Sequence, residues 1–143
     1  NPIAVEPQGY RGYISSRPFG GERAPQHVQN IIIRSYCSDL GIRFLLSATE
    51  VAMPNTFIVL EQVLRDIESV EGVVFYSLLQ LPEDKSARNR IYETVLQQDR
   101  QVHFAVEGIQ IGNGASVERA EDLFGLLQLM PYALKSLTVH QDC

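Results

Sequence analysis

Cysteine is scarce in this sequence, and its two positions are far apart. Cys37 falls within a helical pattern, and Cys143 is the last of the 143 residues. This spacing excludes a disulfide framework and offers no Cys-x-x-Cys metal pair. Because so few cysteines are typical of a reducing compartment, we expect a cytoplasmic protein. The three histidines do not have metal-ligand spacing either, so we expect no metal.

The sequence also lacks a basic excess and a long apolar run. Its net charge is -5 at pH 7, which disfavours broad nucleic-acid binding because that needs a basic face to neutralise phosphates. No stretch approaches the roughly 18 apolar residues that cross a bilayer. We therefore expect neither nucleic acid nor a membrane as a partner. The 45% hydrophobic and 20% charged residues are typical of one globular domain.

What the sequence does contain is a regular alternation between two hydrophobic periods. The period of a strand and that of a helix alternate along the chain. Strands are predicted at 12–16, 42–50, 73–81 and 101–111, and helices at 25–41, 57–70, 85–99 and 116–137. Strands joined by helices pair in parallel, because right-handed crossovers connect them.

This order predicts a single α/β domain of three layers with a four-stranded, mainly parallel sheet. Residues 1–11 would form an N-terminal extension, 12–111 the sheet core and 116–137 a C-terminal helix. The first helix is expected to bury one apolar face, formed by Val28, Ile31, Ile32, Tyr36 and Leu40. Ser116 is the expected N-cap of the last helix.

Ligands of open parallel sheets bind outside the carboxyl ends of the strands. The loop at 12–27 reaches that edge and carries Arg17, Arg23 and the pair Gly20-Gly21 before a predicted helix N-terminus. Backbone N–H groups, the helix dipole and two guanidinium groups favour a phosphate or carboxylate there. Alternatively, the glycines only make a turn and the arginines pair with surface carboxylates.

Glu50 and Glu107 each end a predicted strand at the same edge. Burial there would raise a carboxyl pKa toward the range that proton transfer on a sugar requires. With His27 as a general base and Tyr76 nearby, they are the candidate catalytic residues. Alternatively, each carboxylate caps a neighbouring helix or pairs with an arginine, His27 is an exposed helix-cap residue and Tyr76 belongs to the core. Candidate substrate-binding residues are Ser15, Ser16, Arg17, Arg23, Ser47, Asn55, Ser77 and Gln80.

The span from "GYISS" to "VEGIQI", with the run "GVVFYSLLQLPED", resembles the catalytic domain of serine recombinases, the resolvase and invertase family. That family carries Tyr-x-Arg-Val-Ser on its first strand and Leu-Asp-Arg-Leu-x-Arg at the end of its third. This sequence instead reads Tyr13-Ile14-Ser15-Ser16-Arg17 and Leu78-Leu79-Gln80-Leu81-Pro82-Glu83. The resemblance therefore implies a shared fold without the chemistry of DNA strand exchange.

A second resemblance covers nearly the whole chain. The segments "RGYISSRPFGGERAPQHVQNIIIRSYC", "LLSATEVAMPN", "LEQVL" and "VVFYSLLQLP" resemble the bacterial sporadic carbohydrate cluster proteins. That resemblance implies a carbohydrate pathway and a phosphorylated or nucleotide-linked sugar as the ligand. One function is an enzyme that works by proton transfer without a cofactor, in an epimerisation, isomerisation or elimination. The alternative is a binding or assembly subunit without turnover.

The segment 116–137 carries more apolar residues than one helix needs to cover its own sheet. They are Val117, Ala120, Leu123, Phe124, Leu126, Leu127, Leu129, Met130, Tyr132, Ala133, Leu134 and Leu137. In the recombinases the helix in this place forms the dimer, so the resemblance implies a homodimer or a higher homo-oligomer. Pro131 is expected to kink this helix or divide it in two. In the alternative, both halves fold back on the monomer.

Overall fold

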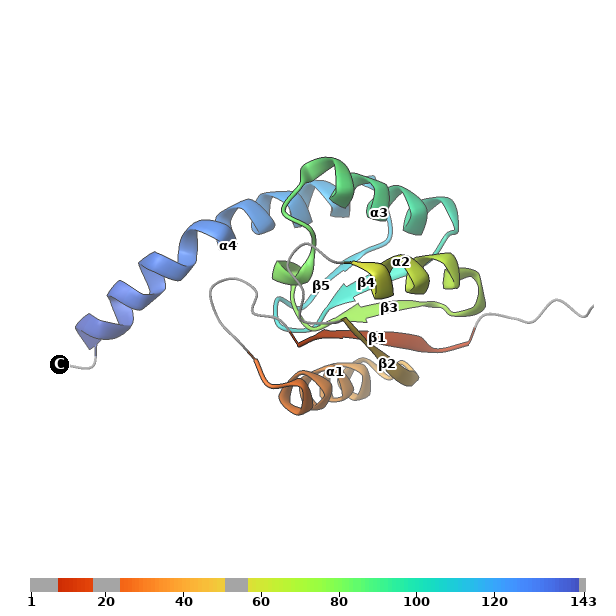
Figure 1. Cartoon of the computed structure of the whole chain (residues 1–143), viewed down its shortest axis with the longest axis horizontal. Helices are drawn as coiled ribbons and strands as arrows, with labels where there is room; N and C mark the ends of the chain where they lie inside the picture. The colour runs from red at the N-terminus through yellow and green to blue at the C-terminus, as the bar shows by residue number, and fades with distance from the viewer. Residues whose placement is uncertain (1–7, 17–23, 51–56, 142–143) are drawn as a thin grey trace, which may run out of the picture.

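A five-stranded mixed sheet forms the centre of the computed structural model, which describes residues 8–16, 24–50 and 57–141 (Figure 1). The strand order is β2-β1-β3-β4-β5. Strands β1 to β4 pair in parallel, and β5 pairs antiparallel with β4. The strands are β1 (Tyr10–Ser15), β2 (Phe44–Glu50), β3 (Gly72–Phe75), β4 (Gln101–Phe104) and β5 (Ile109–Ile111).

Four α-helices within the described residues complete the three layers. Helix α1 lies alone on one face of the sheet, while α2, α3 and the start of α4 lie on the other (Figure 1). The helices are α1 (Gln26–Leu40), α2 (Ile58–Arg65), α3 (Lys85–Gln97) and α4 (Gly114–Gln141). Two short 3-10 turns, η1 (Ile67–Ser69) and η2 (Leu78–Gln80), follow α2 and β3. Within the described part of the chain, no helix is long and apolar enough to cross a bilayer.

The larger hydrophobic core lies between the sheet and the three helices on one face. Aromatic rings cross the central strands there: Tyr13 and Phe75 have ring centroids 5.0 Å apart, and Phe75 and Phe104 5.2 Å. A salt bridge of 2.8 Å from Arg88 Nε to Glu121 Oε2 joins α3 to α4. A smaller core, which includes Ile14, Ile33 and Val74, lies under α1.

The predicted α/β class and the mainly parallel sheet are confirmed, but the segment 101–111 is two strands. The chain reverses after Phe104 through a turn in which Gly108 has φ +66°, a backbone conformation that glycine adopts without strain. The third strand is also shorter than expected. It ends at Phe75, because the Ser77 side chain accepts the Leu79 N–H and starts η2.

Two helical expectations are corrected as well. The buried face of α1 is formed by Gln29, Ile33 and Cys37, while Ile31 is 61% and Leu40 52% exposed. Helix α4 continues through position 131 without division. It begins two residues earlier than expected, and Asn113 rather than Ser116 caps it, since Asn113 Oδ1 accepts the Ser116 N–H at 2.9 Å.

Candidate functional site

A buried carboxamide holds the carboxyl end of β1. Gln29 Oε1 accepts the backbone N–H of Ser15 at 3.0 Å, and Gln29 Nε2 donates to the Ser15 carbonyl at 2.8 Å. The last residue of β1 that pairs with β3 is Tyr13. Beyond Tyr13, β1 therefore has no partner in β3, and the Gln29 side chain bonds the backbone N–H and C=O groups of Ser15 in its place. Sequence analysis missed Gln29, although its spacing of four and eight from Ile33 and Cys37 could have revealed the buried face.

Two further side chains extend this network toward β4. Gln80 Nε2 donates to Ser15 Oγ at 3.1 Å and to Gln29 Oε1 at 3.4 Å, and Gln80 Oε1 accepts the Ser77 N–H at 3.1 Å. The Ser77 hydroxyl in turn donates to Glu107 Oε2 at 2.8 Å. The structure thus brings together Ser15, Ser77 and Gln80, three of the expected substrate-binding residues. All three are buried, and their hydrogen bonds join protein groups.

Both candidate acid–base carboxylates cap the start of a helix. Glu50 is fully buried and accepts three hydrogen bonds: from the Tyr13 hydroxyl at 2.8 Å, the Val59 N–H at 3.1 Å and the Leu60 N–H at 3.0 Å. Glu107 Oε1 accepts the Leu78 N–H at 2.8 Å. These contacts are those of the structural alternative, in which each carboxylate fixes a helix terminus.

The candidate catalytic residues come from different parts of the sheet. Two strands, β1 and β3, lie between β2 and β4, so roughly 14 Å separates the strands that precede Glu50 and Glu107. Glu50 contacts α2 on one face of the sheet, whereas His27 is exposed at the start of α1 on the other. Tyr76 is half-buried and packs against the core under α1.

The remaining expected residues have local partners or lie outside the described residues. The Ser16 hydroxyl donates to the Glu50 carbonyl at 3.1 Å, and the Ser47 hydroxyl donates to Asn30 Oδ1. Arg17, Arg23 and Asn55 lie outside the described residues. The anion site expected at the first two therefore stays a prediction.

An aromatic cluster surrounds a buried histidine under α1. His103 is 2% exposed, and its Nδ1 atom lies 2.7 Å from the Tyr36 hydroxyl. Its ring also makes an edge contact with Tyr10 at 5.2 Å between centroids. Burial lowers the pKa of His103 to about 4, so the ring is neutral at pH 7. Among the described residues, none is a hydrogen-bond partner of His103 Nε2.

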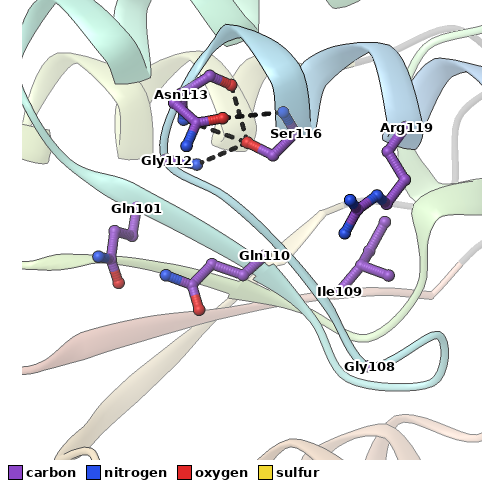
Figure 2. Close-up of a pocket in the computed structure, with 8 residues that line it drawn as sticks. All are labelled: Gln101, Gly108, Ile109, Gln110, Gly112, Asn113, Ser116 and Arg119. Carbon is purple, nitrogen blue, oxygen red and sulfur yellow. Dashed lines mark hydrogen bonds between the residues drawn. The ribbon is translucent and has the colours of Figure 1, made fainter.

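A separate cavity of about 430 Å³ lies beside β5 and the first turns of α4 (Figure 2). We call it the β5–α4 pocket. Gln101 and Gln110 line it from the strands, and Arg119 extends toward it from the helix. The other lining residues are Gly108, Ile109, Gly112, Asn113 and Ser116.

The hydrogen bonds within this pocket fix the start of α4. Ser116 Oγ accepts the N–H groups of Gly112 and Asn113, each at 3.1 Å. Gln101, Gln110 and Arg119 take no part in these bonds (Figure 2). Among the described residues, no group of three His, Cys, Asp or Glu is placed to hold a metal ion.

Comparison with known proteins finds likeness at the level of structure. No family model matches the chain, and no curated protein matches it either. A resolvase family site-specific recombinase from Streptococcus pneumoniae matches 90% of this chain and 99% of its own, with 11% identity and a TM-score of 0.58. The N-terminal catalytic domain of TP901-1 integrase matches 89% of this chain and 98% of its own, with 13% identity and a TM-score of 0.57.

These likenesses confirm the expected fold and leave the second resemblance unsupported. The similarity to sporadic carbohydrate cluster proteins finds no support in the comparisons and stays a hypothesis. Identities of 11% and 13% show a common fold and nothing finer. The chain therefore has the fold of resolvase-family catalytic domains.

Proposed function

We propose that this chain binds a phosphorylated or nucleotide-linked sugar, as a binding or assembly subunit, without turning it over. The observation that supports this proposal most directly is the set of hydrogen bonds to Glu50. Its carboxylate accepts two backbone N–H groups at the start of α2 and the hydroxyl of Tyr13. The side chain is fully buried and both of its oxygens accept bonds from protein groups, so neither oxygen faces a position that a substrate could reach. The structure thus favours the non-catalytic function of the two that the sequence leaves open.

The hydrogen bonds of Glu107 also favour the non-catalytic function. Its two oxygens accept the Ser77 hydroxyl and the Leu78 N–H, each at 2.8 Å. A carboxylate that acts as a base needs an oxygen within hydrogen-bond reach of the substrate. Here both oxygens are turned toward the protein.

The likeness to recombinases raises DNA strand exchange as an alternative function, and the contacts of the two serines at the end of β1 argue against it. Ser15 is fully buried, its hydroxyl accepts a bond from Gln80, and both its backbone groups are bound to Gln29. The Ser16 hydroxyl donates to the Glu50 carbonyl. A nucleophilic hydroxyl must instead face its substrate next to a base that can take its proton.

The test combines a binding assay and an exchange assay on the same protein. Glucose 1-phosphate or UDP-glucose at millimolar concentration should raise the melting temperature, because a ligand that binds only the folded state stabilises it. Neutral glucose is the matched control. After incubation in D2O, mass spectrometry should find no deuterium on a sugar carbon.

Deuterium on a carbon of either sugar would contradict the proposal and favour the enzyme. The variant Glu107→Gln would then identify the base. It keeps a side-chain oxygen that can accept the Leu78 N–H but removes the proton acceptor, so it should abolish exchange if Glu107 carries it.

A further inference from the structure

We propose that the β5–α4 pocket is the binding site for the anionic end of this ligand, and that Arg119 holds it. The inference rests on the proposed function, because it supplies the site for the sugar. The chemical class is a sugar that carries a negative group, phosphate or carboxylate. This position lies near the antiparallel edge of the sheet, beside β5 and the start of α4.

Charge is the first argument for an anionic ligand. The whole chain has 17 acidic and 12 basic residues, yet none of the eight lining residues is acidic and one, Arg119, is basic. The two salt bridges among the described residues belong to Arg65 and Arg88, so within these residues Arg119 has no carboxylate paired with it. A guanidinium group in this state can offer two parallel N–H donors to a phosphate or carboxylate.

The carboxamides supply the second argument. The Oε1 atom of Gln101 accepts the Tyr10 hydroxyl at 2.9 Å, which fixes the side chain and leaves its amide nitrogen as a donor. Gln110 lies on the neighbouring strand and is exposed (Figure 2). Amides both donate and accept, as sugar hydroxyls do. Ile109 faces the other side of β5 from Gln110 and packs against the main core, so a ligand that contacts both Arg119 and the carboxamides would lie across the outer edge of this strand.

The pocket is also large enough, and the start of the helix beside it is held in place. Its volume of about 430 Å³ falls within the range of about 300–1,000 Å³ usual for small-molecule sites. Ser116 and Asn113 hold the first turn of α4 in place by reciprocal bonds. Arg119, which lies one turn further along, is therefore presented from a rigid element.

The test follows the full-length chain by NMR as ligand is added. Glucose 1-phosphate and glucuronate should shift the backbone amides of Gly108, Gly112 and Asn113, whereas glucose should not. The two acids distinguish phosphate from carboxylate as the anion, and inorganic phosphate alone should bind more weakly because it has no sugar hydroxyls. The variant Arg119→Gln should weaken binding by roughly tenfold to a hundredfold, the effect of losing a charge-assisted contact.

Two further variants control the result. Arg90→Gln removes the same charge from an exposed site on α3 and should leave affinity unchanged. Gly112→Ala adds a methyl group at an ordinary contact distance, 3.8 Å from Gln101 Cγ, so the fold should persist while ligand binds less tightly. Equal affinity in Arg119→Gln and the unchanged protein would overturn the site but not the proposed function. Deuterium exchange would overturn the proposed absence of turnover but not the site, and no binding by any probe would overturn both.

Discussion

A single glutamine joins three structural elements at the carboxyl edge of the sheet. Gln29 on α1 bonds both backbone groups of Ser15 in β1, and its oxygen also receives Gln80 from η2. Each of these groups is buried, so none of them can exchange its partner for water without opening the fold. At the scale of the residue, these polar side chains therefore stabilise the fold by satisfying buried hydrogen-bonding groups.

Replacement of Gln29 should destabilise the fold more than replacement of an exposed glutamine on the same helix. Gln29→Ala leaves the N–H and C=O groups of Ser15 buried without partners and should lower the free energy of unfolding by about 1–3 kcal/mol. Urea unfolding followed by circular dichroism measures the change. Gln26→Ala, an exposed position on the same helix, is the control, and equal loss in both variants would contradict the account.

His103 should make stability fall with acid between pH 7 and pH 5. Burial lowers its pKa from 6.5 to about 4 in the folded state, so the unfolded chain takes up a proton first as pH falls. Stability is full above about 6.5 and should drop by about 2 kcal/mol by pH 5. Burial raises the pKa values of its neighbours Tyr10, Tyr36 and Cys37, so these groups stay neutral over this range.

The measurement is the urea unfolding free energy at pH 7 and pH 5. His103→Phe should remove most of the difference between the two values, because phenylalanine keeps a ring in the cluster but does not titrate. An acid loss that is as large in this variant as in the unchanged protein would rule out His103 as its source.

At the scale of the element, a carboxylate fixes the start of α2 and another fixes the start of η2. Among the described residues, the periodicities place every α-helix and four of the five strands in order, because element type depends on local sequence. The face of α1 was misassigned by one position, since a buried glutamine carries no hydrophobic signal. The hairpin of β4 and β5 was missed because the turn at Gly108 interrupts a run that keeps its alternation on both sides.

A single sequence could not show whether the candidate catalytic residues lie close together, because their distances depend on the tertiary fold. Placement of Glu50 at the end of β2 was predictable from the run of apolar residues before it, whereas Glu107 lies in the turn between β4 and β5 rather than at a strand end. The hydrogen-bond donors to these two carboxylates depend on tertiary geometry. They are the Tyr13 hydroxyl and the first N–H groups of α2 and η2. The β5–α4 pocket was likewise invisible, because it joins residues from β4, β5 and α4.

Loss of the Glu50 carboxylate should weaken the start of α2. Glu50→Ala removes the acceptor for two backbone N–H groups and a buried tyrosine hydroxyl, and should cost about 1–3 kcal/mol of unfolding free energy. Thermal unfolding followed by circular dichroism tests this. Glu61→Ala, on the same helix but in an exposed pair of 3.9 Å, should change stability little. A Glu50→Ala protein as stable as the Glu61→Ala protein would show that Glu50 is not a structural cap.

At the scale of the whole molecule, α4 extends far beyond the sheet that its first turns cover (Figure 1). Ala120 and Phe124 are buried in the main core and Leu127 packs against it. By contrast, Leu126 is 55% and Leu129 73% exposed. Exposed apolar residues on a helix that leaves the domain favour a partner surface, which agrees with the predicted homo-oligomer.

We predict a dimer that dissociates when this exposed face is charged. Light scattering at micromolar concentration should give twice the 16.1 kDa mass of the chain, and Leu129→Asp should return it to the mass of one chain with the melting curve preserved. Leu127→Asp is less informative, because this side chain also packs on its own domain. A monomer in the unchanged protein would refute the dimer.

The central claim, binding of an anionic sugar without turnover, is tested most directly by one NMR sample. Saturation-transfer difference spectra of glucose 1-phosphate with the full chain in D2O report contact with the protein, while the intensity of each sugar C–H signal reports exchange. The account predicts saturation transfer that Arg119→Gln diminishes, with every C–H signal at constant intensity over hours. Progressive loss of a C–H signal that depends on folded protein would contradict it.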